Sequence, residues 1–225
     1  MYSPQTLDFL SMNHFMNSRE WYAEHKPEFK THVLQPLIET VESLTPTIER
    51  IDPQIVTIPK IDKTISRVYR DMRRARGAFY RDYMWLSFKR DRRAFPDCPE
   101  FFFMLSPRGF MYGCGLYSAS SETMQCLRQM IQDDHPLYKK AEKAVRAQNV
   151  FVMGGELYKR SRYPDEPARK RDWLDRKEMF LIHESTDFPR LFSDSLNAEM
   201  AAHFEQISPV YHLLFAAAQT ARDAM

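Results

Sequence analysis

The centre of the chain reads Phe101-Phe102-Phe103-Met104-Leu105, then Ser106-Pro107-Arg108-Gly109, then Phe110-Met111-Tyr112-Gly113-Cys114-Gly115-Leu116-Tyr117. The first run is apolar without interruption, which is typical of a buried strand. The next four residues have the composition of a turn, and the third run returns as a second strand. This stretch therefore predicts an antiparallel hairpin.

Three further segments extend the predicted sheet. Residues 65–70 and 83–89 alternate in the way that places successive side chains on opposite faces of a strand. Residues 177–183 are expected to form one more strand. Because the strands up to residue 117 follow one another without helices between them, an antiparallel meander is favoured over βαβ units.

The first third of the chain has the apolar period of helices that bury one face. The stripe consists of Trp21, His25, Phe29, Val33, Leu37, Val41, Leu44 and Ile48. Pro27 and Pro36 interrupt it, so we expect two or three helical pieces, because an interior proline loses a hydrogen bond and clashes with the preceding turn. Further helices are expected at residues 122–131, 137–147, 189–204 and 209–221, with residues 154–176 as a basic excursion.

These elements predict one α+β domain over residues 1–225, with a central antiparallel sheet of about five strands packed against N-terminal and C-terminal helices. No apolar run approaches the roughly 20 residues of a membrane-spanning helix, so no membrane association is expected. Residues 1–11 lack the basic and apolar regions of a signal peptide. The three cysteines, Cys98, Cys114 and Cys126, form an odd set that suits free thiols. The expected location is therefore the cytoplasm.

Positive charge is concentrated in two segments, although the formal net charge is only +2. Residues 67–93 contain ten Lys or Arg and three acids, a net charge of +7. Residues 158–177 contain eight Lys or Arg and four acids, a net charge of +4. Arginine dominates the first segment, and its planar guanidinium suits paired hydrogen bonds to carboxylate or phosphate. Aromatic residues lie between these arginines, a composition expected of a site for an anion or for single-stranded nucleic acid.

The main hypothesis is a pocket on the sheet for a small molecule that carries phosphate or carboxylate. Arginines would bind the anion, Asp71 would orient them, and aromatic rings would form the walls. Two glycines on one strand face would leave room for the ligand. The predicted ligand-binding residues are Arg67, Tyr69, Arg70, Asp71, Tyr80, Arg81, Trp85, Gly113 and Gly115. No nucleophile or base stands out, so binding is predicted without an assigned reaction.

Two alternatives stay open. The two basic segments together would form a surface for nucleic acid or an acidic protein, although the net charge is small and no recognised reader motif occurs. Otherwise, the arginines are structural and pair with acids elsewhere in the fold. No cofactor and no metal are predicted, because Gly113-Cys114-Gly115 lacks the third glycine of a dinucleotide fingerprint and the cysteines lack ligand spacing.

Several segments are similar to the motifs of one family. Asn17-Ser18-Arg19-Glu20-Trp21-Tyr22 is similar to an Asn-Arg-x-Trp-Phe pattern, and Arg67-Val68-Tyr69-Arg70-Asp71 is similar to an Arg-x-Tyr-Arg-Asp motif. Further similar segments are residues 4–10, 113–117, 155–160 and 204–211. Through them the chain resembles the bacterial and fungal proteins grouped as domain of unknown function 2461. The resemblance implies a compact α+β domain and brings no activity. After Arg-Asp, the family's lysines and proline are replaced here by Arg73-Arg74-Ala75-Arg76, so positive charge is kept and a lysine amine is not.

Overall fold

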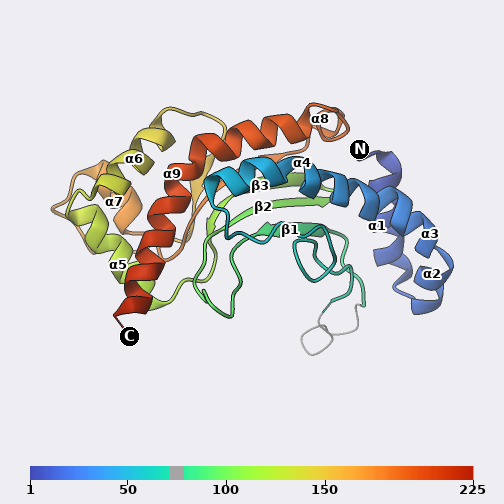
Figure 1. The fold of residues 1–225 in the computed structure, drawn as a ribbon, viewed down its shortest axis with the longest axis horizontal. Coiled ribbons are helices and arrows are strands. Elements are labelled where there is room, and N and C mark those ends of the chain that lie inside the picture. The colour runs from blue at the N-terminus through green and yellow to red at the C-terminus, as the bar shows by residue number, and fades with distance from the viewer. Residues whose placement is uncertain (71–78, 225) are drawn as a thin grey trace. The chain divides into compact units, whose positions relative to one another are not determined.

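The computed structural model describes residues 1–70 and 79–224 (Figure 1). The predicted site residue Asp71 lies outside the described residues. Contacts divide the chain into two compact units. The first unit comprises residues 1–88, 102–112 and 184–202, and the second comprises residues 89–101, 113–183 and 203–225.

Five strands form an antiparallel sheet in an α+β fold, as the sequence predicts. They are β1 (Met84–Phe88), β2 (Glu100–Ser106), β3 (Gly109–Leu116), β4 (Val152–Gly154) and β5 (Met179–Ser185). The strand order is β1-β2-β3-β5-β4, so the last two strands are exchanged relative to a simple meander. Helices separate β3 from β4 along the chain, and β5 takes the place beside β3 that a meander would give to β4.

In the first unit, five helical segments cover residues 4–51. They are α1 (Pro4–Met16), α2 (Arg19–Glu24), α3 (Lys26–Glu28), the π-helix η1 (Phe29–Leu34) and α4 (Gln35–Ile51). Pro36 does not break the helix as the sequence analysis expected. Just before the proline, a wider π turn replaces the α-helical hydrogen-bond pattern. The Gln35 N–H donates to the Lys30 carbonyl oxygen, five residues back, instead of to the carbonyl four residues back. The helix therefore continues through Pro36 into α4.

Helix α4 packs against β1 through the predicted apolar stripe (Figure 1). The side chains of Leu37, Val41 and Leu44 are fully buried. On β1, Met84, Leu86 and Phe88 are fully buried and alternate with partly exposed residues. The alternation predicted for residues 83–89 is therefore confirmed over the length of β1.

The predicted strand at residues 65–70 forms isolated antiparallel bridges instead of a regular strand. The bridges join Ile65 to Leu86 and Tyr69 to Tyr80. Between them, the Trp85 N–H donates to the Ser66 hydroxyl at 2.9 Å, in place of a backbone carbonyl. Because a side chain takes this position, the backbone ladder is interrupted at Ser66 while the segment stays extended.

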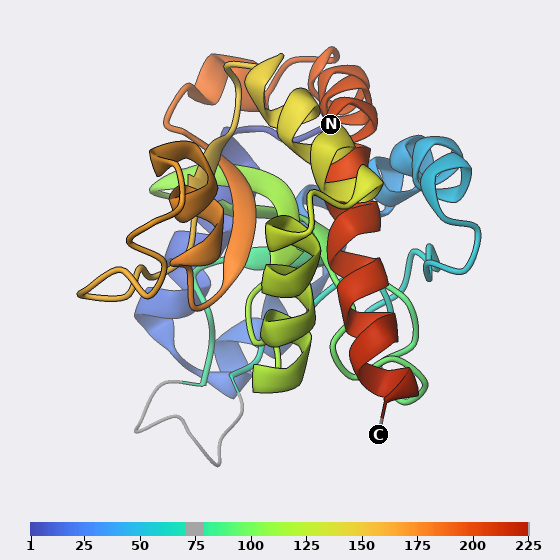
Figure 2. The ribbon, with the colours of Figure 1, turned by 90° about the vertical axis from the view of Figure 1, so that its left-hand side faces the viewer.

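The second unit contains α5 (Ser121–Gln132), α6 (Pro136–Arg146) and α7 (Ala168–Leu174). Ser120 caps α5, because its hydroxyl accepts a hydrogen bond from the Thr123 N–H at 3.2 Å. α6 begins at Pro136, as predicted. α5 packs against α7, and the two lie side by side in Figure 2.

The C-terminal helices differ from the expected pair. A short α8 (Phe188–Leu191) is followed by a single helix, α9 (Leu196–Asp223), which contains Pro209 in its interior. Around the proline, Ile207, Val210 and Tyr211 are fully buried. Burying each such side chain stabilises a fold by roughly 1.5–3 kcal/mol, which together exceeds the cost of about 3 kcal/mol for an interior proline. In the part of the chain that the structure describes, no helix is long and apolar enough to cross a membrane.

Candidate functional site

Three tyrosines meet in the first unit and form what we call the tyrosine cluster: Tyr22, Tyr69 and Tyr80. Tyr22 belongs to α2, and the other two face each other across the isolated bridge. The ring centroids of Tyr22 lie 5.4 Å from those of Tyr69 and 5.3 Å from those of Tyr80, and Tyr69 and Tyr80 are 5.1 Å apart. The sequence analysis selected Tyr69 and Tyr80 but missed Tyr22, because no sequence spacing relates α2 to this bridge.

The end of α1 positions the Tyr80 side of the cluster. The Asn17 side-chain oxygen accepts a hydrogen bond from the Phe79 N–H at 2.6 Å. The Nδ1 atom of His14 lies 3.0 Å from the Tyr80 carbonyl oxygen and, in the protonated tautomer, donates to it. These two contacts fix the backbone of residues 79–80, and therefore the direction of the Tyr80 ring.

The Tyr22 and Tyr80 hydroxyls stay protonated at neutral pH. Burial, together with the nearby Tyr69 side chain, raises the pKa of Tyr22 above its ordinary value and the pKa of Tyr80 to about 12. Within the described residues, the buried Tyr80 hydroxyl makes no hydrogen bond of standard geometry. Each of these hydroxyls therefore offers an O–H donor instead of a negative charge.

A cavity of about 280 Å³ adjoins the cluster, lined by Tyr22, Ile61, Arg67, Val68 and Tyr69. Arg67 makes an ion pair with Asp62. The Arg67 and Asp62 side chains are 63% and 50% exposed, so water screens this pair and it contributes little stability. The guanidinium at this cavity can therefore exchange Asp62 for a ligand anion at small cost.

The other predicted arginines have different partners. The Arg70 Nε–H donates to the Tyr80 carbonyl oxygen at 3.1 Å. The guanidinium carbon of Arg81 lies 5.5 Å from the centroid of the Tyr83 ring. Arg70 and Arg81 directly follow the bridged tyrosines Tyr69 and Tyr80. In an extended segment, their side chains therefore leave the backbone on the face opposite to the tyrosine rings. Of the three predicted arginines, Arg67 is the one that lines the described cavity.

Trp85 and the two glycines lie elsewhere. The Trp85 ring stacks on Phe102, with centroids 4.8 Å apart. Gly113 and Gly115 belong to the second unit, in β3. A Cβ atom added to Gly115 would lie 2.2 Å from the Phe180 Cβ atom, so Phe180 occupies the space that the sequence analysis assigned to a ligand. The structure thus brings together Arg67, Tyr69 and Tyr80, with Tyr22 in addition.

The family comparison covers nearly all of the chain. A family model described as "conserved hypothetical protein (DUF2461)" matches residues 5–213. The chain belongs to this family. No curated protein matches the chain. The family description names no activity, so the ligand must be inferred from the site itself.

Family membership confirms the resemblance drawn from the sequence motifs. The Arg67–Asp71 motif supplies Arg67 and Tyr69 to the cavity beside the tyrosine cluster. The Gly113–Tyr117 motif lies largely in β3, where Gly115 and Tyr117 both contact Phe180. The two family motifs therefore have different surroundings, one beside a cavity and one in close packing.

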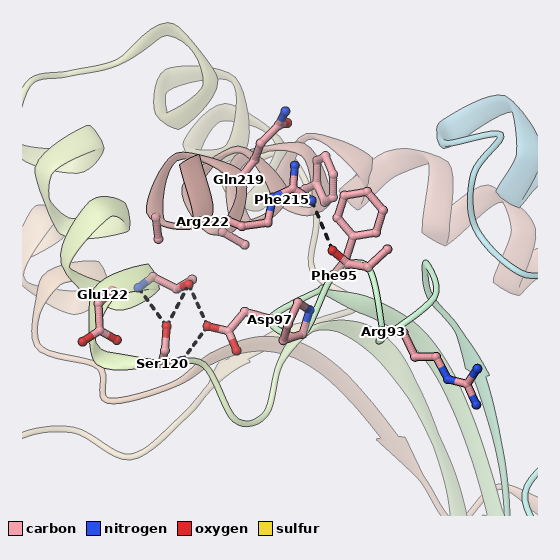
Figure 3. A pocket seen from close by; sticks show the side chains of 13 residues that line it. Arg93, Phe95, Asp97, Ser120, Glu122, Phe215, Gln219 and Arg222 are labelled. Atoms are coloured by element: carbon pink, nitrogen blue, oxygen red, sulfur yellow. Dashed lines mark hydrogen bonds between the residues drawn. The ribbon is translucent and has the colours of Figure 1, made fainter. Parts of the chain in front are cut away.

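A second cavity, of about 350 Å³, lies in the second unit and was missed by the sequence analysis (Figure 3). Its lining residues come from three segments: residues 93–97, the start of α5, and the end of α9. Arg93 lies in the basic segment 67–93, which was the available sequence signal. The partners of that segment, Phe215 and Arg222, are distant in sequence and carry no motif.

The second basic segment is largely bound to its own unit. Three cationic groups surround the Tyr158 ring: Arg162 at 3.8 Å, Arg128 at 5.5 Å and Lys177 at 5.9 Å from its centroid. The buried Arg176 donates to the Gly155 carbonyl oxygen and to the Asp172 carboxylate. These contacts give several basic residues of this segment structural roles.

The described residues offer few groups for binding a metal ion or for thiol chemistry. Among residues 1–70 and 79–224, no three His, Cys, Asp or Glu side chains come together in a way that could hold a metal ion. The three cysteines are free thiols. Burial raises the pKa of the Cys114 thiol well above its ordinary value, so this thiol is a poor nucleophile.

Proposed function

We propose that the chain binds a small molecule carrying a phosphate or carboxylate group in the cavity beside the tyrosine cluster. The observation that carries the proposal is the lining of this cavity. Arg67, Tyr22 and Tyr69 offer N–H and O–H donors, and Ile61 and Val68 offer apolar surface. No acidic residue is among the described residues that line it. Such a wall favours an anion with a small apolar body.

Each group has a distinct role in the proposed complex. The Arg67 guanidinium exchanges Asp62 for the ligand anion and forms the charged hydrogen bonds. The Tyr69 hydroxyl donates a further hydrogen bond, and Tyr22 and Tyr80 hold the Tyr69 ring by aromatic contacts. Arg70 fixes the Tyr80 backbone, and Arg81 adds positive potential nearby. No reaction is proposed, since no described nucleophile or base faces the cavity.

Thermal unfolding of the full chain with phosphate or succinate, compared with chloride at equal ionic strength, tests the proposal. A ligand at tenfold its Kd stabilises the native state by about 1.4 kcal/mol. For a chain of this size, that corresponds to a rise in Tm of roughly 3–6 °C. Arg67→Ala should abolish the rise, and Asp62→Asn, which frees the guanidinium, should enlarge it. Arg160→Ala, which removes an exposed arginine of the second unit, is the matched charge control.

Two results would contradict the proposal. If Arg67→Ala keeps the full shift, the anion binds elsewhere. If no small anion changes the Tm while single-stranded oligonucleotides bind with an affinity that falls steeply with salt, the basic surface is the functional feature instead.

A further inference from the structure

We propose a second binding site, in the cavity of Figure 3, for an organic monocarboxylate with a flat apolar body. All the residues that line this cavity belong to the second unit. The cavity volume of about 350 Å³ is within the range of small-molecule sites, which starts near 300 Å³. It is large enough for one aromatic ring with a short side chain.

The inner wall of the cavity is apolar and aromatic. Phe95 and Phe215 lie with their ring centroids 5.7 Å apart and their planes at 51°. Ala218 and Ala221, on the same helix as Phe215, add small side chains beside them. Small residues next to two aromatic rings leave a hollow that suits a planar apolar group.

Positive charge gathers at the aromatic rings. The guanidinium carbon of Arg222 lies 4.8 Å from the Phe95 centroid. The guanidinium carbon of Arg90 lies 5.0 Å from the same centroid and 4.0 Å from that of Phe215. Two guanidinium groups at one phenyl ring make the electrostatic potential at this end of the cavity positive, which favours an anion.

Arg222 is the group that we assign to the ligand carboxylate. In Figure 3 the Arg222 side chain extends toward Phe95 and Phe215. The Arg93 and Glu122 side chains extend away from these two rings. Its Nη1–H donates to the Ala94 carbonyl oxygen at 3.2 Å, which fixes its direction. Its acidic partner, Asp223, is an exposed neighbour at 3.5 Å, and such a pair is weak.

Two acids line the cavity, Asp97 and Glu122. Glu122 extends away from the aromatic rings in Figure 3, and Asp97 is already used by the fold. Its Oδ2 atom accepts hydrogen bonds from the Ser120 N–H at 2.8 Å and the Thr123 hydroxyl at 2.7 Å (Figure 3). Burial would raise the pKa of Asp97, but these hydrogen bonds and the charge of Arg92 lower it below the usual range. Asp97 therefore anchors the start of α5, and an amine ligand gains less from it than a carboxylate gains from Arg222.

The test compares three probes that share a benzyl group and differ in charge, on the full chain: phenylacetate, benzyl alcohol and benzylamine. Isothermal titration should show saturable binding of phenylacetate that is at least about tenfold tighter than that of the alcohol or the amine. Arg222→Gln should weaken phenylacetate by about the same factor and leave the alcohol unchanged, since it removes the charge and keeps a polar side chain. Ala218→Phe should fill the cavity and abolish binding of both.

The first proposed site also suits an anion with an apolar body, so Arg67→Ala is used to remove that site. The phenylacetate binding that requires Arg222 should remain in the Arg67→Ala chain. Equal affinity for the acid and the alcohol would overturn the assignment of Arg222. Undiminished phenylacetate binding by the Ala218→Phe chain, or its loss in the Arg67→Ala chain, would place the ligand outside this cavity. Arg222 is partly exposed, so the Arg222→Gln chain should fold even if the Ala218→Phe chain does not.

Discussion

Phe180 lies between two glycines, each on a neighbouring strand. Substituting each glycine tests whether close packing against Phe180 is the reason that the position must be glycine. Gly154 is the direct cross-strand partner of Phe180, and Gly115 lies on β3, on its other side. A Cβ atom on Gly115 would lie 2.2 Å from the Phe180 Cβ and 2.3 Å from its Cα. A Cβ atom on Gly154 would instead meet the ring, at 2.1 Å from Cε2.

The two substitutions should differ in kind. Carbon atoms in contact stay about 3.5–4.0 Å apart, so Gly115→Ala forces the β3 and β5 backbones apart by more than about 1 Å. Overpacking typically costs about 1–3 kcal/mol, and with a backbone as the obstacle we expect about 3 kcal/mol. That lowers the Tm by roughly 6–12 °C in a chain of this size. Gly154→Ala meets a side chain that can turn away, and we expect about 1–2 kcal/mol.

A double-mutant cycle with Phe180→Ala separates the two causes. Removing the ring should relieve Gly154→Ala almost completely, whereas Gly115→Ala should keep its full cost because the Cα and Cβ atoms remain. Urea unfolding followed by circular dichroism gives the free energies of unfolding. If Phe180→Ala relieves both glycine substitutions equally, or if Gly115→Ala costs less than about 0.5 kcal/mol, the close approach of β3 and β5 described above is wrong.

Three further predictions concern the helices, the thiols and the tyrosines. Pro209→Ala should raise the free energy of unfolding by about 1–3 kcal/mol, because it restores a hydrogen bond inside α9; an unchanged urea midpoint would contradict this. Ellman's reagent should modify Cys114 only after denaturation, because burial raises its pKa and blocks access; reaction of all three thiols at one rate in the native chain would refute this. The Tm should fall as the pH rises from 10 toward 12, because buried tyrosines with a raised pKa, among them Tyr80, Tyr112 and Tyr138, make the native state bind more protons than the unfolded state there, and Tyr80→Phe should reduce this slope. A slope that is the same in both chains would show that Tyr80 is not one of its sources.

Local sequence patterns predicted the elements whose stability is decided locally. The alternation in residues 83–89 predicted a strand with two distinct faces, and in the structure Met84, Leu86 and Phe88 form the buried face of β1. The turn residues between β2 and β3 mark real ends of elements because turns depend on a few neighbouring residues. The predicted hairpin is therefore confirmed, and the helix predicted at residues 122–131 corresponds to α5.

Prolines gave the wrong boundaries where distant packing outweighed local cost. Pro36 is accommodated by the π turn before it, and Pro209 by the buried side chains around it. Neither effect can be read from nearby residues, since each depends on the elements that the helix packs against. The strand order has the same origin: nothing in residues 152–154 or 179–185 states which of them lies next to β3.

The site was predictable only in part, because charges that are close in the sequence do not have to converge on one site in the fold. In an extended segment, successive side chains point to opposite faces. The described basic residues of residues 67–93 therefore obtain separate partners. Arg67 pairs with Asp62, Lys89 pairs with Glu100, and Arg90 packs on two phenylalanines. Convergence needs groups from different elements, as at the tyrosine cluster, where α2 supplies a ring that no motif connects to the bridge. Arginine density in a sequence therefore does not locate a site, because the pairing of distant elements decides which arginines face a cavity.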